Sequence, residues 1–319
     1  MTMLQMHTNA DNLELDIRKR GLVAQFVIWF LFIASVFSVC ARMGTKFVMR
    51  RAFGLDDVLI LTGQLFYVAQ CATISKAVST AFNPNSSTIS GETLTLFLKL
   101  DYASISFLIL ALALVKWSAH EVVRQLSPVS YHHRTAASLS ILVGLWLVTA
   151  IGANLFQCAL PKPWDYVHSS RCIDRKAWWT YVTVVNLLTE LILVGLYIIM
   201  FGNLRMSLPR KAAIIAAFST RLVVVGITSV QLAVFRSSTQ DPVHVQGSWL
   251  ILALNQGIIS SSVITACIPH LKPFMQNLQS GVMQVGHTSD GDMLIQPSLA
   301  PPSSGSYELS RGLGERGGM

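Results

Sequence analysis

The sequence predicts an all-α membrane protein, a seven-transmembrane-helix bundle followed by a disordered C-terminal tail. The chain has 319 residues, of which 52% are hydrophobic and only 13% are charged, whereas soluble domains usually carry about 25% charged residues. Apolar runs of roughly 20 residues recur along it, and a helix of that length spans about 30 Å of hydrocarbon. The final stretch is rich in Ser, Gly and Pro and has few apolar residues, a composition that does not support a packed core.

Seven apolar segments are the expected membrane helices, and short polar loops separate them. They are Leu22–Ala41, Val58–Ser75, Leu94–Trp117, Ala136–Leu160, Trp178–Gly202, Ala212–Phe235 and Trp249–Ile268. Pro269 closes the last of them, because proline cannot continue a helix. We therefore expect a polar N-terminal segment over residues 1–21, a membrane domain over 22–275 and a disordered cytosolic tail over 276–319.

Two aspartates, Asp56 and Asp57, stand at the start of the second predicted helix. Acidic residues in the first turn suit the positive end of a helix dipole, so helix capping explains the pair. A contact with an ion or with a partner is the alternative. The loop before them, from Arg42 onward, also carries Lys46 and Arg50.

The fifth and sixth predicted helices each carry one charge in an apolar setting, Glu190 and Arg221. At ~1.5 Å per residue, Glu190 lies about 16 Å and Arg221 about 14 Å from the short basic turn that joins the two helices. An isolated charge at the centre of a bilayer costs about 2.5–3.5 kcal/mol on insertion scales. Opposite charges at matched depth therefore predict an ion pair inside the bundle, which either sets the fold or contributes to a site.

Other polar residues of the predicted helices recur at spacings of three, four and seven, so they share helix faces. Such faces serve either as hydrogen-bonding contacts between helices, at about 0.6–2 kcal/mol each, or as the lining of a polar cavity. Both readings stay open. If a small-molecule cavity exists, we expect these residues to line it: Lys116, Asn186, Tyr197, Arg221, Gln231, Asn255 and Gln256.

Several classes of function lack their sequence signals. The net charge is +8, but the Lys and Arg residues form no dense tract of the kind that binds nucleic acid. The five cysteines show no zinc spacing, and the motifs of nucleotide, dinucleotide and metalloprotease sites are missing, so we expect no metal and no cofactor. The seventh helix contains no lysine, which excludes a retinal Schiff base there.

The orientation of the helices is predicted from two features, because Lys and Arg are almost evenly divided between the two sides. With the N-terminus outside or in the lumen, the glycosylation sequon at Asn85 lies where it can be modified. Cys158 and Cys172 then lie on the oxidising side, where a disulfide would tie the fourth helix to its following loop. We expect a multi-pass protein of the plasma membrane or an endomembrane.

Several motifs, taken in order, resemble the fungal rhodopsin-like integral membrane family over residues 22 to 280. They are the basic loop leading to Gly54-Leu55-Asp56-Asp57-Val58, Lys116 after an Ala/Leu-rich run, Cys158 with Trp164 and Cys172-Ile173-Asp174, Asn186 with Glu190, and Cys267-Ile268-Pro269-His270-Leu271-Lys272-Pro273-Phe274. The resemblance implies a seven-helix bundle with its N-terminus outside. It also implies a receptor-like protein, and it implies a role in secondary metabolism, because many members belong to secondary-metabolite gene clusters. Glu190 stands where the family often has Asp, and Arg221 where a small residue is usual.

Two functions follow as hypotheses. The first is a small-molecule-binding, receptor-like or accessory protein of fungal secondary metabolism, with the lipid bilayer around it and a cytosolic protein partner if it signals. The second is a membrane-embedded cyclase acting on a lipophilic terpenoid or polyketide intermediate, with Glu190 or Asp101 as a buried acid that protonates the substrate. A tight contact between Glu190 and Arg221 would disfavour Glu190 in that role, because pairing stabilises the carboxylate.

Overall fold

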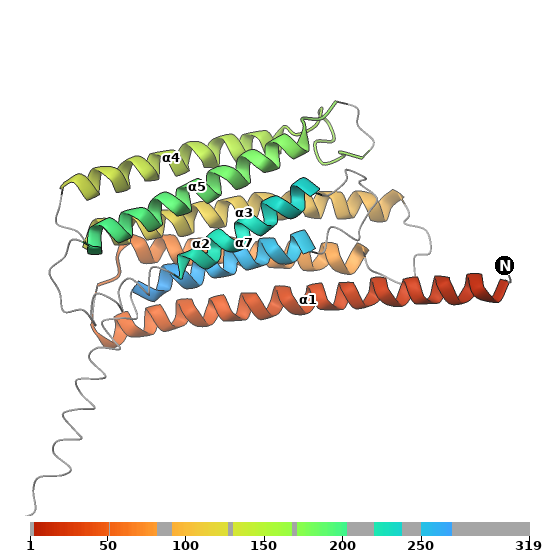
Figure 1. The fold of residues 1–319 in the computed structure, drawn as a ribbon, viewed down its shortest axis with the longest axis horizontal. Coiled ribbons are helices and arrows are strands. Elements are labelled where there is room, and N and C mark those ends of the chain that lie inside the picture. Colours follow the sequence, from red (N-terminus) through yellow and green to blue (C-terminus); the bar gives the residue numbers. More distant parts are fainter. Residues whose placement is uncertain are drawn as a thin grey trace, which may run out of the picture. The chain divides into compact units, whose positions relative to one another are not determined.

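The computed structural model describes residues 3–50, 52–81, 91–126, 130–167, 171–202, 220–237 and 250–269. Within these ranges every regular element is a helix, and no strand occurs among them. Figure 1 shows the helices of the membrane domain running alongside one another. The prediction of an all-α membrane bundle is confirmed.

The described part of the chain contains seven helices. They are α1 (Met3–Val48), α2 (Leu55–Ala81), α3 (Gly91–Leu126), α4 (Ser130–Leu155), α5 (Arg175–Gly202), α7 (Arg221–Ser237) and a last helix, Leu250–Pro269. Six of them are long and apolar enough to cross a membrane. The exception is α7, whose described part has 17 residues.

Most helices are longer than the apolar runs that predict them. The first was expected to end at Ala41, but α1 continues to Val48 because buried partners neutralise the basic residues of its last turns. The fourth was expected to reach Leu160 but ends at Leu155, and Pro161 keeps the residue before it out of the helical region. The predicted start of the sixth helix, at Ala212, lies outside the described residues.

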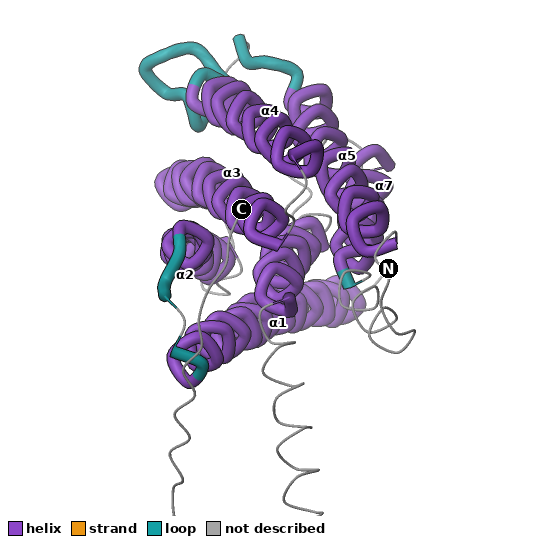
Figure 2. The backbone as a smooth tube through the Cα atoms, turned by 90° about the vertical axis from the view of Figure 1, so that its left-hand side faces the viewer, coloured by secondary structure: helices purple, strands orange, loops and turns teal. Residues whose placement is uncertain are grey.

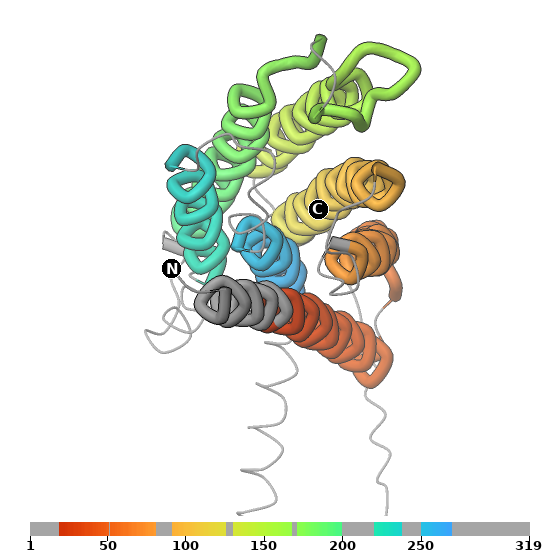
Figure 3. Tube along the Cα trace, turned by 90° about the vertical axis from the view of Figure 1, so that its right-hand side faces the viewer, coloured from red at the N-terminus to blue at the C-terminus, as the bar shows by residue number. Residues whose placement is uncertain are grey.

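The last helix lies at the centre of the described helices. Helices adjacent in sequence pack on one another from α1 to α5, and α5 then packs on α7. In Figures 2 and 3 the Leu250–Pro269 helix, blue in Figure 3, lies among its neighbours rather than at the edge. Its most apolar stretch is 56% buried, which is the highest share among the six described candidate spans, against 22% for α1.

The outward faces of the helices are apolar, as a lipid environment requires. Large hydrophobic side chains stand exposed along α1 and α4, including Phe26, Phe30, Phe37, Ile141, Leu145 and Val148. Exposed apolar patches of this extent are rare on soluble monomers. Many polar and charged side chains of the spans are instead buried between helices, among them Arg42, Lys116, Glu190 and Arg221, and this arrangement places the candidate site inside the bundle.

Candidate functional site: buried charges inside the bundle

Glu190 of α5 is the centre of a buried cluster of charges. Its carboxylate accepts a hydrogen bond from Lys116 Nζ of α3 at 2.6 Å through Oε1, and one from Arg221 Nη1 of α7 at 3.1 Å through Oε2. All three side chains are at most 2% exposed. We call these three residues the charge triad. The predicted pair of Glu190 and Arg221 is confirmed, and Lys116 joins it from a third helix.

The charge triad is held by contacts on both of its sides. Lys116 Nζ also donates to the backbone oxygen of Asn186, one helical turn before Glu190, at 3.3 Å. Tyr197 lies further along the same face of α5 and donates through its hydroxyl to the backbone oxygen of Ala119 at 3.2 Å. The Arg221 guanidinium lies 5.9 Å from the centre of the Tyr197 ring. These contacts fix α3, α5 and α7 relative to one another.

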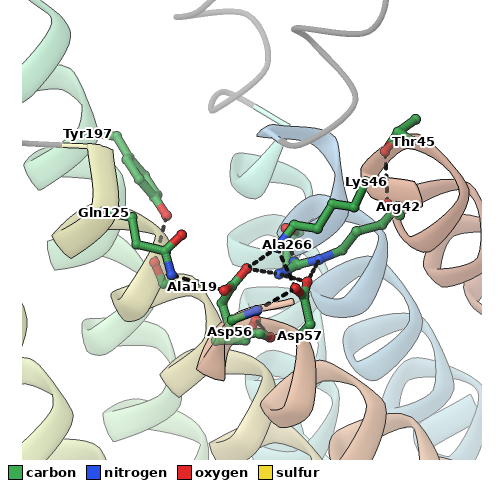
Figure 4. A network of polar contacts seen from close by, with 11 residues as sticks. Arg42, Thr45, Lys46, Asp56, Asp57, Ala119, Gln125, Tyr197 and Ala266 are labelled. Carbon is green, nitrogen blue, oxygen red and sulfur yellow. Dashed lines mark hydrogen bonds and ion pairs between the residues drawn. The ribbon is translucent and has the colours of Figure 1, made fainter. Parts of the chain in front are cut away.

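A second buried cluster joins the end of α1 to the start of α2. Arg42 contacts Asp56 and Asp57 at 2.5 and 3.1 Å, and Lys46 contacts the same carboxylates at 2.9 and 2.5 Å. We call Arg42, Lys46, Asp56 and Asp57 the four-charge cluster. Arg42 also donates to the backbone oxygen of Ala266 in the last helix, as Figure 4 shows.

The start of α2 explains why this cluster forms. Asp57 accepts a hydrogen bond from the backbone N–H of Gly54 at 3.0 Å, so its carboxylate caps the helix as well as pairing with cations. A side chain on Gly54 would collide with the Asp56 carboxylate, which makes glycine necessary at that position. Capping therefore occurs as the sequence predicted, and it occurs together with ion pairs to Arg42 and Lys46 that the sequence interpretation did not include. A contact of these aspartates with a bound ion or a partner stays a prediction.

Helix α3 connects the four-charge cluster to the charge triad. Ser118 donates to the backbone oxygen of Asp56 at 2.8 Å, and Gln125 donates to the Asp56 carboxylate at 2.9 Å. Both residues belong to the same α3 segment as Lys116 and Ala119. Figure 4 shows Gln125 and Ala119 of this segment beside the aspartates. A displacement of this α3 segment would therefore change the contacts of both the four-charge cluster and the charge triad.

The other predicted cavity residues are paired with one another in the middle of the bundle. Gln231 of α7 donates to Asn255 of the last helix, and Gln256 donates to Gln70 of α2 at 2.9 Å. Cys71 contacts Gln256 Oε1 at 3.7 Å. These amide side chains form hydrogen bonds between helices, which is the first of the two roles that the sequence predicted for the polar helix faces. Whether they also line a cavity stays a prediction.

Asp101 lies apart from the charge triad, near the start of α3. It accepts a hydrogen bond from Arg175 at 3.0 Å, and the Arg175 guanidinium stacks at 3.7 Å on the ring of Tyr166 in the loop between α4 and α5. Burial, and then the nearby Asp101 charge, raise the pKa of the Tyr166 phenol above its ordinary value. A disulfide joins Cys158 to Cys172 in the same loop.

A groove of about 600 Å³ lies between the start of α5 and the end of α7. Thr180, Tyr181 and Phe235 line it together with the charged residues Asp174, Lys176 and Arg236. None of the predicted cavity residues contributes to it. The groove is therefore separate from the charge triad.

The sequence interpretation missed two features of the site. Lys116 was expected in a cavity rather than on Glu190, and Arg42 and Lys46 were assigned to a loop. The four-residue spacing of Arg42 and Lys46, beside an Asp-Asp pair a short turn away, was the available signal. Asn85 lies outside the described residues.

The contacts also bear on the proposed acids of a cyclase. Glu190 accepts from two cations, and Asp101 accepts from one. Each contact favours the ionised carboxylate over the protonated form that would donate a proton. By the criterion stated above, the tight Glu190–Arg221 contact disfavours Glu190 as the general acid.

Neutralising the carboxylate of the charge triad tests its electrostatic role. Glu190→Gln should destabilise the protein by about 3–5 kcal/mol, because it leaves two buried cations without a counter-charge. Adding Arg221→Gln should recover part of that loss, since one of the two cations is removed. Melting temperatures of the purified single and double variants measure both effects. A double variant less stable than Glu190→Gln alone would contradict this account.

The four-charge cluster gives a second prediction, with a matched control on the surface. Asp57→Asn should also cost about 3–5 kcal/mol, because Arg42 and Lys46 would share one carboxylate in a buried site. Glu121 pairs with Arg124 near the surface, where the Arg124 side chain is 45% exposed and the Glu121 side chain is 21% exposed. Glu121→Gln removes this carboxylate and should change the free energy of unfolding by only about 0–1 kcal/mol. Equal melting temperatures for the two variants would show that the cluster contributes nothing.

Comparison with known proteins agrees with this architecture. The model of the fungal rhodopsin domain matches residues 41–277, a range that contains both charge clusters. No curated protein matches the chain. This multi-pass membrane protein belongs to the fungal rhodopsin family.

Proposed function

We propose that this protein binds a lipophilic small molecule inside the bundle and acts as a receptor-like or accessory protein of fungal secondary metabolism. The charge triad is the observation that carries the proposal. A bundle that needed only packing would avoid buried ions, because desolvation often outweighs their attraction and apolar residues can replace them without loss of stability. Charged residues within membrane spans commonly mark substrate or ligand sites.

The arrangement of the helices supports a role in sensing. The charge triad joins α3, α5 and α7, and the four-charge cluster joins α1, α2 and the last helix through Ala266. The shared α3 segment contacts both clusters. A ligand that changes the contacts of Lys116 would therefore also act on the start of α2.

We do not assign the acid role of a cyclase to Glu190 or Asp101, since each carboxylate is ion-paired. A cyclase with another catalytic group stays an alternative outcome of the experiment. The secondary-metabolism role rests on the family resemblance, and the charge triad supplies the site on which it can be tested.

Metabolite and transcript profiling of a deletion strain tests the function. Loss of the gene should change transcript levels of biosynthetic genes together with several metabolites, and wild-type protein should restore both. Arg221→Gln should fail to restore them. Arg236→Gln, an exposed arginine of the same helix, should restore them fully. Accumulation of a single precursor would instead support an enzyme, and unchanged profiles would contradict the proposal.

We also propose that the N-terminus lies outside or in the lumen. Disulfides form in oxidising compartments, and the Cys158–Cys172 disulfide follows the end of α4. Because successive spans alternate in direction, that end shares a side with the start of α1. The sequon at Asn85, between α2 and α3, would then also be lumenal.

Glycosylation provides the test of orientation. Protein expressed in a fungal host should shift to higher mobility on glycosidase treatment, and Asn85→Gln should abolish the shift. An engineered sequon in the loop between α1 and α2 should stay unmodified. Modification of that second sequon instead of Asn85 would reverse the orientation.

A further inference from the structure

The buried charges of the described bundle do not balance. Among its described residues the buried cations are Arg42, Lys46, Lys116 and Arg221, and the buried anions are Asp56, Asp57 and Glu190. The four-charge cluster contains equal numbers of each. The surplus positive charge therefore belongs to the charge triad, where Glu190 is shared by two cations.

Two nitrogen atoms of the Arg221 guanidinium donate no hydrogen bond within the described residues. Only Nη1 reaches Glu190, whereas Nε and Nη2 have no hydrogen-bond partner among the described residues, although the side chain is 1% exposed. These two nitrogens lie along one edge of the guanidinium plane, the edge that binds a carboxylate through two parallel hydrogen bonds. Unsatisfied donors are unusual in a buried site and call for a partner.

The surroundings of Arg221 indicate what kind of molecule would bring that partner. Val224, one turn along α7, is fully buried, and Leu193 and Tyr197 of α5 belong to one apolar cluster with Ala119. An apolar body with a single anionic group matches this combination better than a hydrophilic ion does.

We propose that the charge triad binds the anionic group of a lipophilic small molecule, a carboxylate or an enolate, on the free Nε–Nη2 edge of Arg221. This inference rests on the proposed ligand-binding function and names its ligand class. The anion supplies the missing negative charge, because Glu190 offsets only one of the two positive charges of Lys116 and Arg221.

Thermal unfolding of the full chain in phosphatidylcholine nanodiscs tests the proposal, because this lipid carries no net charge. After Cys40, which is exposed, is replaced by serine in every variant, a thiol-reactive dye reports unfolding through the buried Cys71 and Cys267. The probes are sodium decanoate, its neutral counterpart methyl decanoate, and sodium iodide at matched concentration. Decanoate should raise the melting temperature, and the ester and iodide should not.

The variants separate a specific site from general detergent-like effects. Arg221→Gln should weaken decanoate binding at least tenfold, and Arg236→Gln on the same helix should leave it unchanged. Glu190→Gln increases the surplus charge and should strengthen binding at least tenfold. Because this effect has the opposite sign to that of Arg221→Gln, it decides the matter even if the arginine variant does not fold.

Three results would overturn the proposal: equal effects of decanoate and its ester, undiminished binding by Arg221→Gln, or no gain in Glu190→Gln. If iodide alone raised the melting temperature, the surplus positive charge of the charge triad would be assigned to binding of an inorganic anion, and the organic ligand would be rejected. These binding results can be distinguished from the outcome of the metabolite and transcript profiling of the deletion strain. A deletion phenotype that depends on Arg221, without decanoate binding, would leave the function standing and remove only this ligand class.

Discussion

The structure depends on one constraint: a charge buried in the membrane interior needs a counter-charge supplied by another helix. Glu190 satisfies it with Lys116 from α3 and Arg221 from α7, at 2.6 and 3.1 Å. Hydrocarbon offers no water to compensate any of the three, so the helices that carry them have a single favourable arrangement. Interhelical packing of apolar side chains alone would be less selective, because lipid tails compete for the same contacts.

The four-charge cluster applies the same constraint at the end of α1. Its cations lie on one helix and its carboxylates on the next, with a short turn between them. Each aspartate contacts both cations, so removing any one residue removes two of the four contacts of the cluster. The hydrogen bond from Arg42 to Ala266 extends this arrangement to the last helix. One cluster therefore joins α1, α2 and the last helix, and the other joins α3, α5 and α7. The two sets are connected by the contacts of α3 with Asp56 and by the hydrogen bond from Gln231 to Asn255.

Much of the fold could be predicted from the sequence because composition and length decide membrane insertion. The pairing of Glu190 with Arg221 was also predictable, since depth within a span can be counted along a helix. The partner Lys116 could not be found in this way, because a third helix may face the pair from any direction. The extent of α1 was missed for a related reason. Arg42 and Lys46 look like loop residues until the carboxylates that neutralise them are placed beside them.

The central position of the Leu250–Pro269 helix has a consequence for biogenesis. A ribosome delivers this segment after all the other described spans, yet Gln70, Gln231 and Arg42 find partners on it. Until this helix is synthesised, the side chains of Gln70, Gln231 and Arg42 lack these hydrogen-bond partners. The earlier helices must then either leave the central position of the bundle empty or be kept apart by the insertion machinery. Among the described helices, the central one is thus the last to be added to the bundle. A nascent chain that stopped before Trp249 would lack this helix and would be a substrate for membrane quality control.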